Sequence, residues 1–200
     1  ILSFHIVSQI GYMVLGLALN SRLALIGAMF YLIHHIIVKA NLFLVAGVIH
    51  RVTGGSQLKS IGGLYAAQPI LAILFLIPAF SLAGFPPLSG FWAKYVLIQA
   101  SMELSDWIAA GTALLVGLLT IYSMTKIWGE AFWKPHPAGD DALNGKTIAW
   151  SAWVPIGTLA ALTVIIGLFP SPFYAFAEMS AQSLLDPSGY IEAVLGGSAP

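Results

Sequence analysis

Residues 31 to 47 read YLIHHIIVKANLFLVAG, an apolar stretch with two adjacent histidines and a lysine near its middle. On a helix, Tyr31, His35 and Lys39 recur every four residues and therefore form one polar stripe. A lysine can hold or release a proton as the field around it changes, and a histidine that titrates near neutral pH can pass the proton on. The spacing predicts a proton relay.

Structural roles for the same residues compete with this relay. Lys39 could extend along the helix to the membrane surface, but such snorkelling works near helix ends, and Lys39 lies near the middle of its apolar run. Single histidines in membranes often bridge helices, so His35 has a structural alternative. His34 points about 100° away from His35 on the helix and suits packing as well as a relay.

A second lysine, Lys94, follows an interruption in another apolar run, GFPPLSG at 84–90. Pro86 and Pro87 remove two backbone donors, and Gly84 and Gly90 permit non-helical dihedral angles, so the helix must open there. Irregular backbone at membrane depth persists only where protein encloses it or where it lines a cavity. The freed carbonyls and helix ends bind cations, which predicts a functional lysine beside a helix break.

Other polar residues of the apolar runs are weaker candidates. Ser8, Gln9 and Tyr12 either line a water path or join helices. Lys126 and Glu130, four residues apart near the end of a later run, predict an exposed ion pair or a lipid contact, with proton uptake as the alternative.

Composition sets the class of protein. Hydrophobic residues make up 58% of the 200 residues and charged residues 8%, against about one quarter charged in soluble domains. The formal net charge is zero, which argues against nucleic acid as a partner. Cysteine is absent, so the chain has no disulfide, zinc–thiolate or iron–sulfur site. Without a phosphate loop, catalytic triad or metal-ligand cluster, we expect no enzyme chemistry, no cofactor and no metal.

Five stretches are apolar enough to suggest membrane crossings of about 20 residues each. They are His5 to Leu19, Leu23 to Ile49, Leu64 to Ala100, Trp107 to Trp128, and Thr147 to Phe169. The third is too long for one straight span and contains the GFPPLSG break. It crosses the membrane either once, as a discontinuous helix, or twice, as two antiparallel spans.

Basic residues favour a single broken crossing. Short cytoplasmic loops collect Lys and Arg. With one crossing, Arg51, Lys59, Lys134 and Lys146 lie on one side of the membrane and only Arg22 lies in a loop on the other. The loops at 51–62 and 133–146 are then cytoplasmic and the C-terminal tail lies outside.

The expected domains are a transmembrane helical bundle over 1–170 and an amphipathic tail over 171–200. The tail has a one-sided apolar pattern, Phe173, Phe176, Ala177, Ser180 and Leu184. This pattern suits a helix at the membrane interface or against a neighbouring subunit, and the alternative is a frayed terminus. The chain begins at Ile1 inside an apolar run, and we therefore expect it to be a fragment of a longer membrane protein.

Four segments resemble one family when taken in order: SQIGYMVLGLAL, FYLIHHIIVKANLFLVAG, GFPPLSGFWAK and DPSGYIEAVLG. They are similar to the C-terminal half of the D subunits of multisubunit Mrp sodium/proton antiporters. The wider superfamily comprises antiporter-like membrane subunits of respiratory complex I and related hydrogenases. The pattern H-x-x-x-K-x-x-L-F from His35 to Phe43 belongs to the superfamily, whereas PPLSGFW and the tail favour the Mrp D subunits.

The resemblance implies the second half of an all-α inverted-repeat fold, with about five crossings and one discontinuous helix. It implies that Lys39 and Lys94 carry protons and that His35 relays them, with His34 and Tyr31 as further relay positions. Tyr31 stands where complex I relatives often carry a histidine.

The function implied is Na⁺/H⁺ exchange by a multi-pass subunit of the prokaryotic plasma membrane. Its partners would be the other subunits of a hetero-oligomeric complex and the lipid bilayer. The alternative is a proton-pumping subunit of an NADH-quinone oxidoreductase or a membrane-bound hydrogenase, with the redox chemistry in other subunits. A scaffold with degenerate ion sites is disfavoured because Lys39, His35 and Lys94 are all present.

Overall fold

The computed structural model describes residues 1–196, and all regular secondary structure in this part of the chain is helical. The helices are α1 (Leu2–Leu19), α2 (Arg22–Thr53), α3 (Leu64–Ala67), α4 (Pro69–Ala83), α5 (Ser89–Glu103), α6 (Trp107–Trp128), α7 (Trp150–Leu168), α8 (Ser171–Leu185) and α9 (Ser188–Leu195). A π-helical turn, Gly129–Trp133, extends α6. The predicted all-α class is confirmed.

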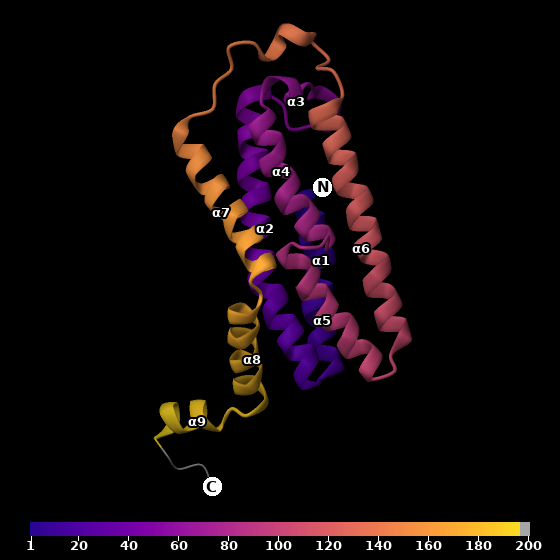
Figure 1. Ribbon diagram of the computed structural model, residues 1–200, viewed down its shortest axis with the longest axis vertical. Coiled ribbons are helices and arrows are strands. Elements are labelled where there is room, and N and C mark those ends of the chain that lie inside the picture. Colours follow the sequence, from indigo (N-terminus) through magenta and orange to yellow (C-terminus); the bar gives the residue numbers. More distant parts are fainter. Residues whose placement is uncertain (197–200) are drawn as a thin grey trace.

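Four of the described helices are long and apolar enough to cross a membrane: α1, α2, α6 with its extension, and α7. Helices α4 and α5 follow one another in the same direction and together form a fifth crossing (Figure 1). The predicted discontinuous helix is therefore confirmed, with its interruption between Ala83 and Ser89.

Local signals in the sequence set the helix ends. The Ser21 hydroxyl accepts a hydrogen bond from Ala24 N at 3.2 Å and caps the start of α2. Gly54, with φ of 72°, ends the same helix in the left-handed region that favours glycine. The Asp106 carboxylate accepts from Ala109 N at 3.0 Å at the start of α6.

The break between α4 and α5 is fixed by its own turn and by α7. Gly84 has φ of 93°, and its N–H donates to Phe80 O at 3.1 Å. Trp92 Nε1 donates to Gly167 O at 2.8 Å, and a Cβ on Gly167 would lie 2.1 Å from Pro87 O. Only a glycine lets α7 pass this close to the interrupted backbone.

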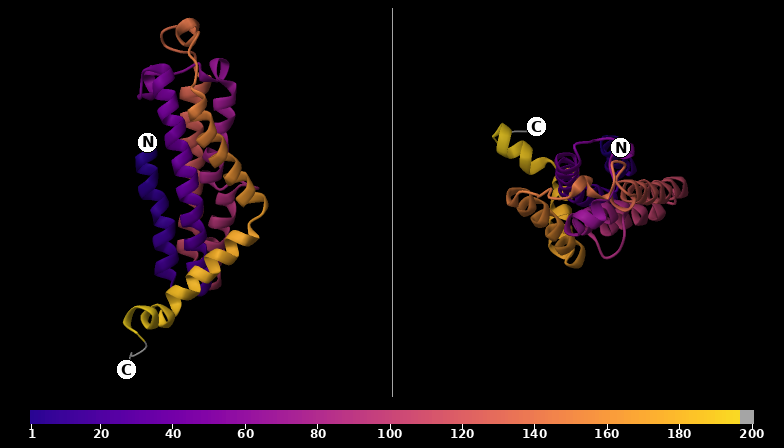
Figure 2. Two further views of the ribbon diagram at one scale, coloured as in Figure 1. Left: turned by 90° about the vertical axis from the view of Figure 1, so that its left-hand side faces the viewer. Right: turned by 90° about the horizontal axis from the view of Figure 1, so that it is seen from above.

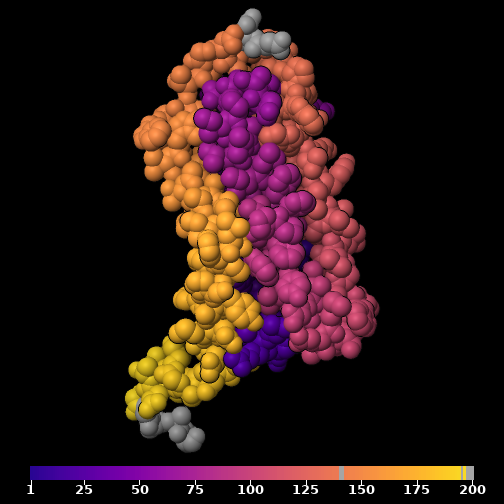
Figure 3. All heavy atoms as spheres, in the orientation of Figure 1, coloured from indigo at the N-terminus to yellow at the C-terminus, as the bar shows by residue number. Residues whose placement is uncertain are grey.

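Helix α2 is the centre of the bundle, in contact with α1, α4, α5, α7 and α8 (Figures 1 and 2). One buried apolar cluster joins its C-terminal half to α4 and α7, and a second joins its N-terminal half to α1, α5 and α8. On one face of the molecule, the segment from α3 to α5 fills the space between α6 and α7 (Figure 3). In lipid, such an interior is held by van der Waals packing and hydrogen bonds between helices.

Loops 54–63 and 134–149 lie at one end of the bundle, and the tail lies at the other (Figure 1). Arg51, Lys59, Lys134 and Lys146 therefore share one end, which we call the basic end, while Arg22 lies at the opposite end. This arrangement agrees with the single broken crossing predicted from the charges.

The tail begins with α8, which packs on α2 through Ala177 and Ala181, both fully buried. Arg22 of α2 forms an ion pair with Glu178 at 2.8 Å. Helix α9 extends beyond the bundle (Figure 2). Residues 197–200 of the expected tail lie outside the described residues.

The fold predicts which surface positions share a side of the membrane. Single cysteines replacing Ser56 and Ala138 should react with a membrane-impermeant maleimide from one side, and a cysteine replacing Ser188 from the other. The measurement is labelling of right-side-out and everted vesicles in an otherwise cysteine-free background. Labelling of the positions at 56 and 138 from opposite sides would contradict the arrangement.

Candidate functional site

Lys94 lies at the break, one turn into α5. Its Nζ donates a hydrogen bond to the carbonyl oxygen of Ala83, the last residue of α4, at 3.1 Å. The same ammonium lies 4.9 Å from the ring centroid of Tyr12 on α1. The C-terminal end of a helix carries partial negative charge, and an aromatic face attracts a cation. Lys94 is only 6% exposed, and its ammonium is stabilised by the carbonyl at the break and by the aromatic ring of α1.

Glycines make room for the Lys94 side chain. A Cβ on Gly84 would lie 2.9 Å from Lys94 Cδ, and one on Gly117 of α6 would lie 3.8 Å from Nζ. Helices α4, α5 and α6 thus enclose Lys94 and still leave room for its side chain.

Lys39 has a similar environment on α2. Its Nζ donates to the carbonyl oxygen of Leu2 on α1 at 3.0 Å, and the residue is 5% exposed. Among the side chains that the structure describes, no carboxylate lies at ion-pair distance from Lys39 or Lys94. Both buried lysines are therefore held by backbone carbonyls.

The predicted stripe of Tyr31, His35 and Lys39 is buried along its length and faces α1. The Tyr31 ring stacks on Tyr12 with centroids 4.9 Å apart, and on His35 with centroids 6.2 Å apart. The Tyr31 hydroxyl donates to the side-chain oxygen of Gln9. The two tyrosines thus connect the surroundings of Lys94 to His35 and onward to Lys39.

His34 faces the other way and contacts the break itself. Its Nδ1 lies 2.8 Å from Ser89 Oγ, and Ser89 Oγ lies 3.0 Å from Ser81 Oγ. The N–H of Gly90 donates to Ser81 Oγ at 3.2 Å. His34 also meets the Tyr31 ring edge-on at 5.5 Å. His34 therefore ties α2 to both halves of the broken helix.

Gly90 differs from the other predicted break residues because it lies within the first turn of α5. A Cβ there would lie 1.8 Å from Ser81 O and 2.8 Å from His34 Cε1. Gly84, Pro86 and Pro87 form the non-helical turn, whereas Gly90 permits the close contact that joins the two half-helices.

Several polar partners of these residues were not predicted from the sequence. They are Ser81 and Ser89 beside the break, His5 at the start of the first crossing, and Thr120 and Ser123 on α6. Ser81 and Ser89 flank GFPPL, which was a usable signal. The α6 hydroxyls sit in a run of ordinary apolar character, and only the packing of α6 on α1 identifies them.

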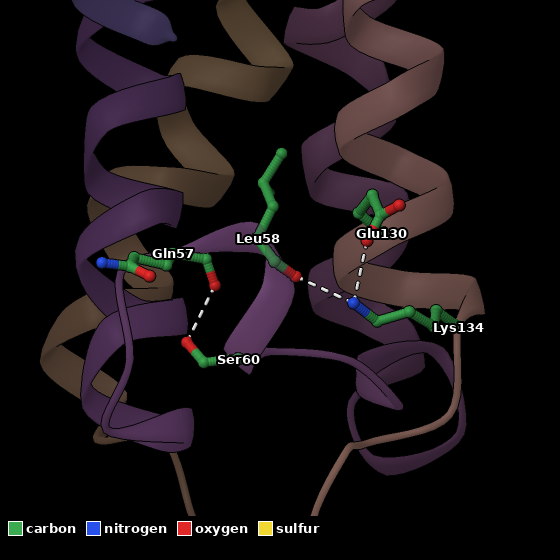
Figure 4. A network of polar contacts seen from close by, with 5 residues as sticks. All are labelled: Gln57, Leu58, Ser60, Glu130 and Lys134. Atoms are coloured by element: carbon green, nitrogen blue, oxygen red, sulfur yellow. Dashed lines mark hydrogen bonds and ion pairs between the residues drawn. The ribbon is translucent and has the colours of Figure 1, made fainter.

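Of the roles expected for Lys126 and Glu130, the ion pair between these two residues does not form. Glu130 pairs instead with Lys134 at 2.8 Å, and Lys134 Nζ also donates to Leu58 O at 2.9 Å (Figure 4). The π-helical turn at the end of α6 brings Glu130 and Lys134 together over loop 54–63. Lys126 is exposed.

A cavity of about 760 Å³ opens beneath this contact at the basic end. Its lining includes Gln57 and Leu58 of the loop, Ile127 of α6, and Leu2, whose carbonyl binds Lys39. The cavity therefore lies against the backbone that holds Lys39. Among the described residues, no group of three His, Asp or Glu side chains could hold a metal ion.

Comparison with known proteins places this geometry in a family. The family described as NADH:quinone oxidoreductase/Mrp antiporter, TM, matches residues 1–121. The chain is 48% identical to the D subunit of the Na⁺/H⁺ antiporter of Alkalihalophilus pseudofirmus, over 98% of this chain. The chain belongs to the NADH:quinone oxidoreductase/Mrp antiporter transmembrane family. It is thus a multi-pass membrane protein, as predicted.

Further relatives agree with the resemblance to D subunits. The corresponding D subunit of the Na⁺/H⁺ antiporter of Bacillus subtilis is 34% identical over 98% of this chain. The chain spans 39% of the length of each of these two relatives.

Solved structures of family members have the same fold. The Mrp complex from a Dietzia species contains a chain that matches with a TM-score of 0.88 at 35% identity, over 98% of this chain and 44% of that one. Respiratory complex I from Thermus thermophilus matches with a TM-score of 0.77 at 25% identity, over 90% of this chain and 38% of that one. Both neighbours are multisubunit membrane assemblies.

The close packing at Gly90 predicts a large effect of a single methyl group. Gly90→Ala should destabilise the subunit by about 1–3 kcal/mol, as overpacking of an interior does, because Ser81 O and His34 cannot both move away. The measurement is the apparent unfolding temperature of the detergent-solubilised complex.

Gly111→Ala on α6 is the matched control, since a Cβ there meets nothing within 4 Å. Equal unfolding temperatures for the two variants would contradict the close packing at the break.

Proposed function

We propose that this chain forms part of a cation/proton antiporter subunit and carries protons along the buried path between Lys39 and Lys94. The complete complex couples this movement to Na⁺ exchange. The observation that carries the proposal is a pair of buried lysines on backbone carbonyls, connected by the buried side chains of Tyr12, Tyr31 and His35.

The ligands of the two lysines suit reversible proton binding. Placing an ionisable residue inside a membrane is energetically unfavourable, and for Lys94 a carbonyl and an aromatic face offset this free energy. A lysine held by a carbonyl has no ion pair that must be broken before its proton leaves. Lys39 and Lys94 are therefore suited to take up and release protons as neighbouring charges change.

Histidine and tyrosine side chains provide the steps between the lysines. His35 stacks on Tyr31 on the Lys39 side, and His34 contacts Ser89 on the Lys94 side. A tyrosine ordinarily keeps its proton at neutral pH, so Tyr31 orients its neighbours rather than carrying charge. His35 and His34 are the relay residues, and enclosed water completes the path.

The orientation follows from the charged loops. Because basic residues collect in cytoplasmic loops, the basic end faces the cytoplasm and the tail lies on the outer side. The membrane is the plasma membrane of a prokaryotic cell. Residues 1–170 form the conducting bundle, and α8 of the tail packs on α2 towards its outer end.

The rest of the path lies in the partners. The similarity to antiporter D subunits and to a chain of a solved Mrp complex supports a complete subunit that works with other subunits of an antiporter. Na⁺ is exchanged by the assembly, in which this bundle handles protons.

A proton-pumping role in a complex I-like assembly is the second candidate, favoured by the match to complex I of Thermus thermophilus. In that case the redox chemistry lies in other subunits, and flavin and iron–sulfur proteins copurify with this one. Purification of the native complex, followed by absorption spectroscopy and mass spectrometry of its subunits, separates the two candidates.

The lysine at the break gives the sharpest test of antiport. In the complete subunit within its complex, Lys94→Ala should abolish the sodium-induced collapse of a pH gradient, because the proton carrier at the break is gone. The measurement uses everted vesicles from cells that lack other antiporters, with a fluorescent pH indicator.

Lys126→Ala removes an exposed lysine and is the matched control, which should transport as the unaltered protein does. Immunoblots of the purified complex report assembly. Normal collapse with Lys94→Ala would refute the proposed path, and loss of the subunit from the membrane would assign Lys94 a structural role.

A further inference from the structure

A second line of polar side chains runs beside the α2 stripe, between α1 and α6. His5 Nε2 lies 2.7 Å from Ser123 Oγ, and Gln9 Nε2 donates to Thr120 Oγ1 at 3.2 Å. The Tyr12 hydroxyl donates to the backbone oxygen of Ala113. The α1 members recur every three or four residues, and so do the α6 hydroxyls, so each set occupies one helix face.

This line reaches both lysines. At one end, the Leu2 carbonyl binds Lys39, and His5 follows Leu2 by about one helical turn. At the other end, the Tyr12 ring lies over the ammonium of Lys94. The α1–α6 face therefore offers a connection between the lysines that does not pass through His35.

His5 is the member of this line whose side chain ordinarily gains and loses a proton at a ring nitrogen. Its Nε2 faces Ser123, whereas its Nδ1 is buried and has no hydrogen-bond partner among residues 1–196. The charges that act on its ring are the positive charges of Lys39 on α2 and Lys94 on α5, while α6 presents the Ser123 hydroxyl. The link between α1 and α6 uses only Nε2 of His5, so Nδ1 remains available to bind a proton.

We propose that His5 is a proton-binding residue on a second branch of the path, receiving protons from the Lys39 side at Nδ1 and releasing them at Nε2 towards Ser123. This inference rests on the proposed antiport function. The Lys39 ammonium becomes a neutral amine as His5 becomes an imidazolium. His5 returns to neutral when Nε2 gives its proton to the Ser123 oxygen, which releases its own hydrogen to water, or to water directly. Each step breaks one bond to hydrogen and forms another.

A structural role for His5 makes a different prediction. If the ring only links α1 to α6, a glutamine, which can hydrogen-bond to Ser123 but cannot hold a proton, should serve as well. Replacement by glutamine therefore separates the two roles.

The experiment measures sodium-driven proton movement in everted vesicles that carry the complete complex. His5→Gln should lower the maximal rate by the share of the protons that this branch carries, with the half-saturating sodium concentration unchanged. Ser123→Ala should lower the rate in the same way, and Ser123→Thr, which keeps the hydroxyl, should restore it.

His136→Gln, in loop 134–149, is the matched control and should leave the rate unaltered. A normal rate for His5→Gln or for Ser123→Ala would overturn the inference. If His5→Gln does not assemble, the comparison of Ser123→Ala with Ser123→Thr decides. Equal rates of these two variants overturn the inference, and a slow alanine variant supports it.

Lys94→Ala is measured alongside to separate this inference from the proposed function. Normal transport by Lys94→Ala would refute the proposed function itself. Loss of transport by Lys94→Ala together with a normal rate for His5→Gln would refute only this branch.

Discussion

The structure depends on giving a charged amine a ligand inside a hydrocarbon layer. A continuous helix has no spare carbonyl in its interior, because each one accepts a hydrogen bond from the next turn. Interrupting the crossing after Ala83 frees a carbonyl at mid-depth, and the Lys94 ammonium takes it. A break of this kind exposes other backbone groups as well, and these must be enclosed by protein. Much of the bundle provides that enclosure.

Besides α6, three helices close around the break, each by a different contact. Helix α2 reaches it through His34, which hydrogen-bonds to Ser89, and α7 reaches it through Gly167, whose carbonyl accepts from Trp92. Helix α1 places the Tyr12 ring over the lysine. The contacts that stabilise the irregular backbone are therefore also those that connect Lys94 to the rest of the polar path. Stability and proton transfer use the same residues, so a variant at the break must be tested for assembly and transport separately.

The sequence was enough to predict the crossings and the break, because long apolar runs and a Pro-Pro pair between glycines leave few alternatives at membrane depth. It also indicated Lys39 and Lys94, since a lysine in an apolar run requires compensation. It could not identify the compensating groups, which are the carbonyls of Leu2 and Ala83, because every residue has a carbonyl. It could not identify the partner of Glu130 either, because Lys126 and Lys134 both stand four residues from it, and only the structure shows that Lys134 forms the ion pair.

The central claim is that an amine at position 94 carries the proton, and chemical replacement of that amine tests it most directly. Lys94→Cys in the complete complex should not transport, and aminoethylation of the cysteine, which rebuilds a lysine-like side chain, should restore sodium-driven proton movement. Methylation of the same thiol should not, with the extent of both modifications confirmed by mass spectrometry. Transport by the unmodified or methylated cysteine variant, or its absence after complete aminoethylation, would contradict the account.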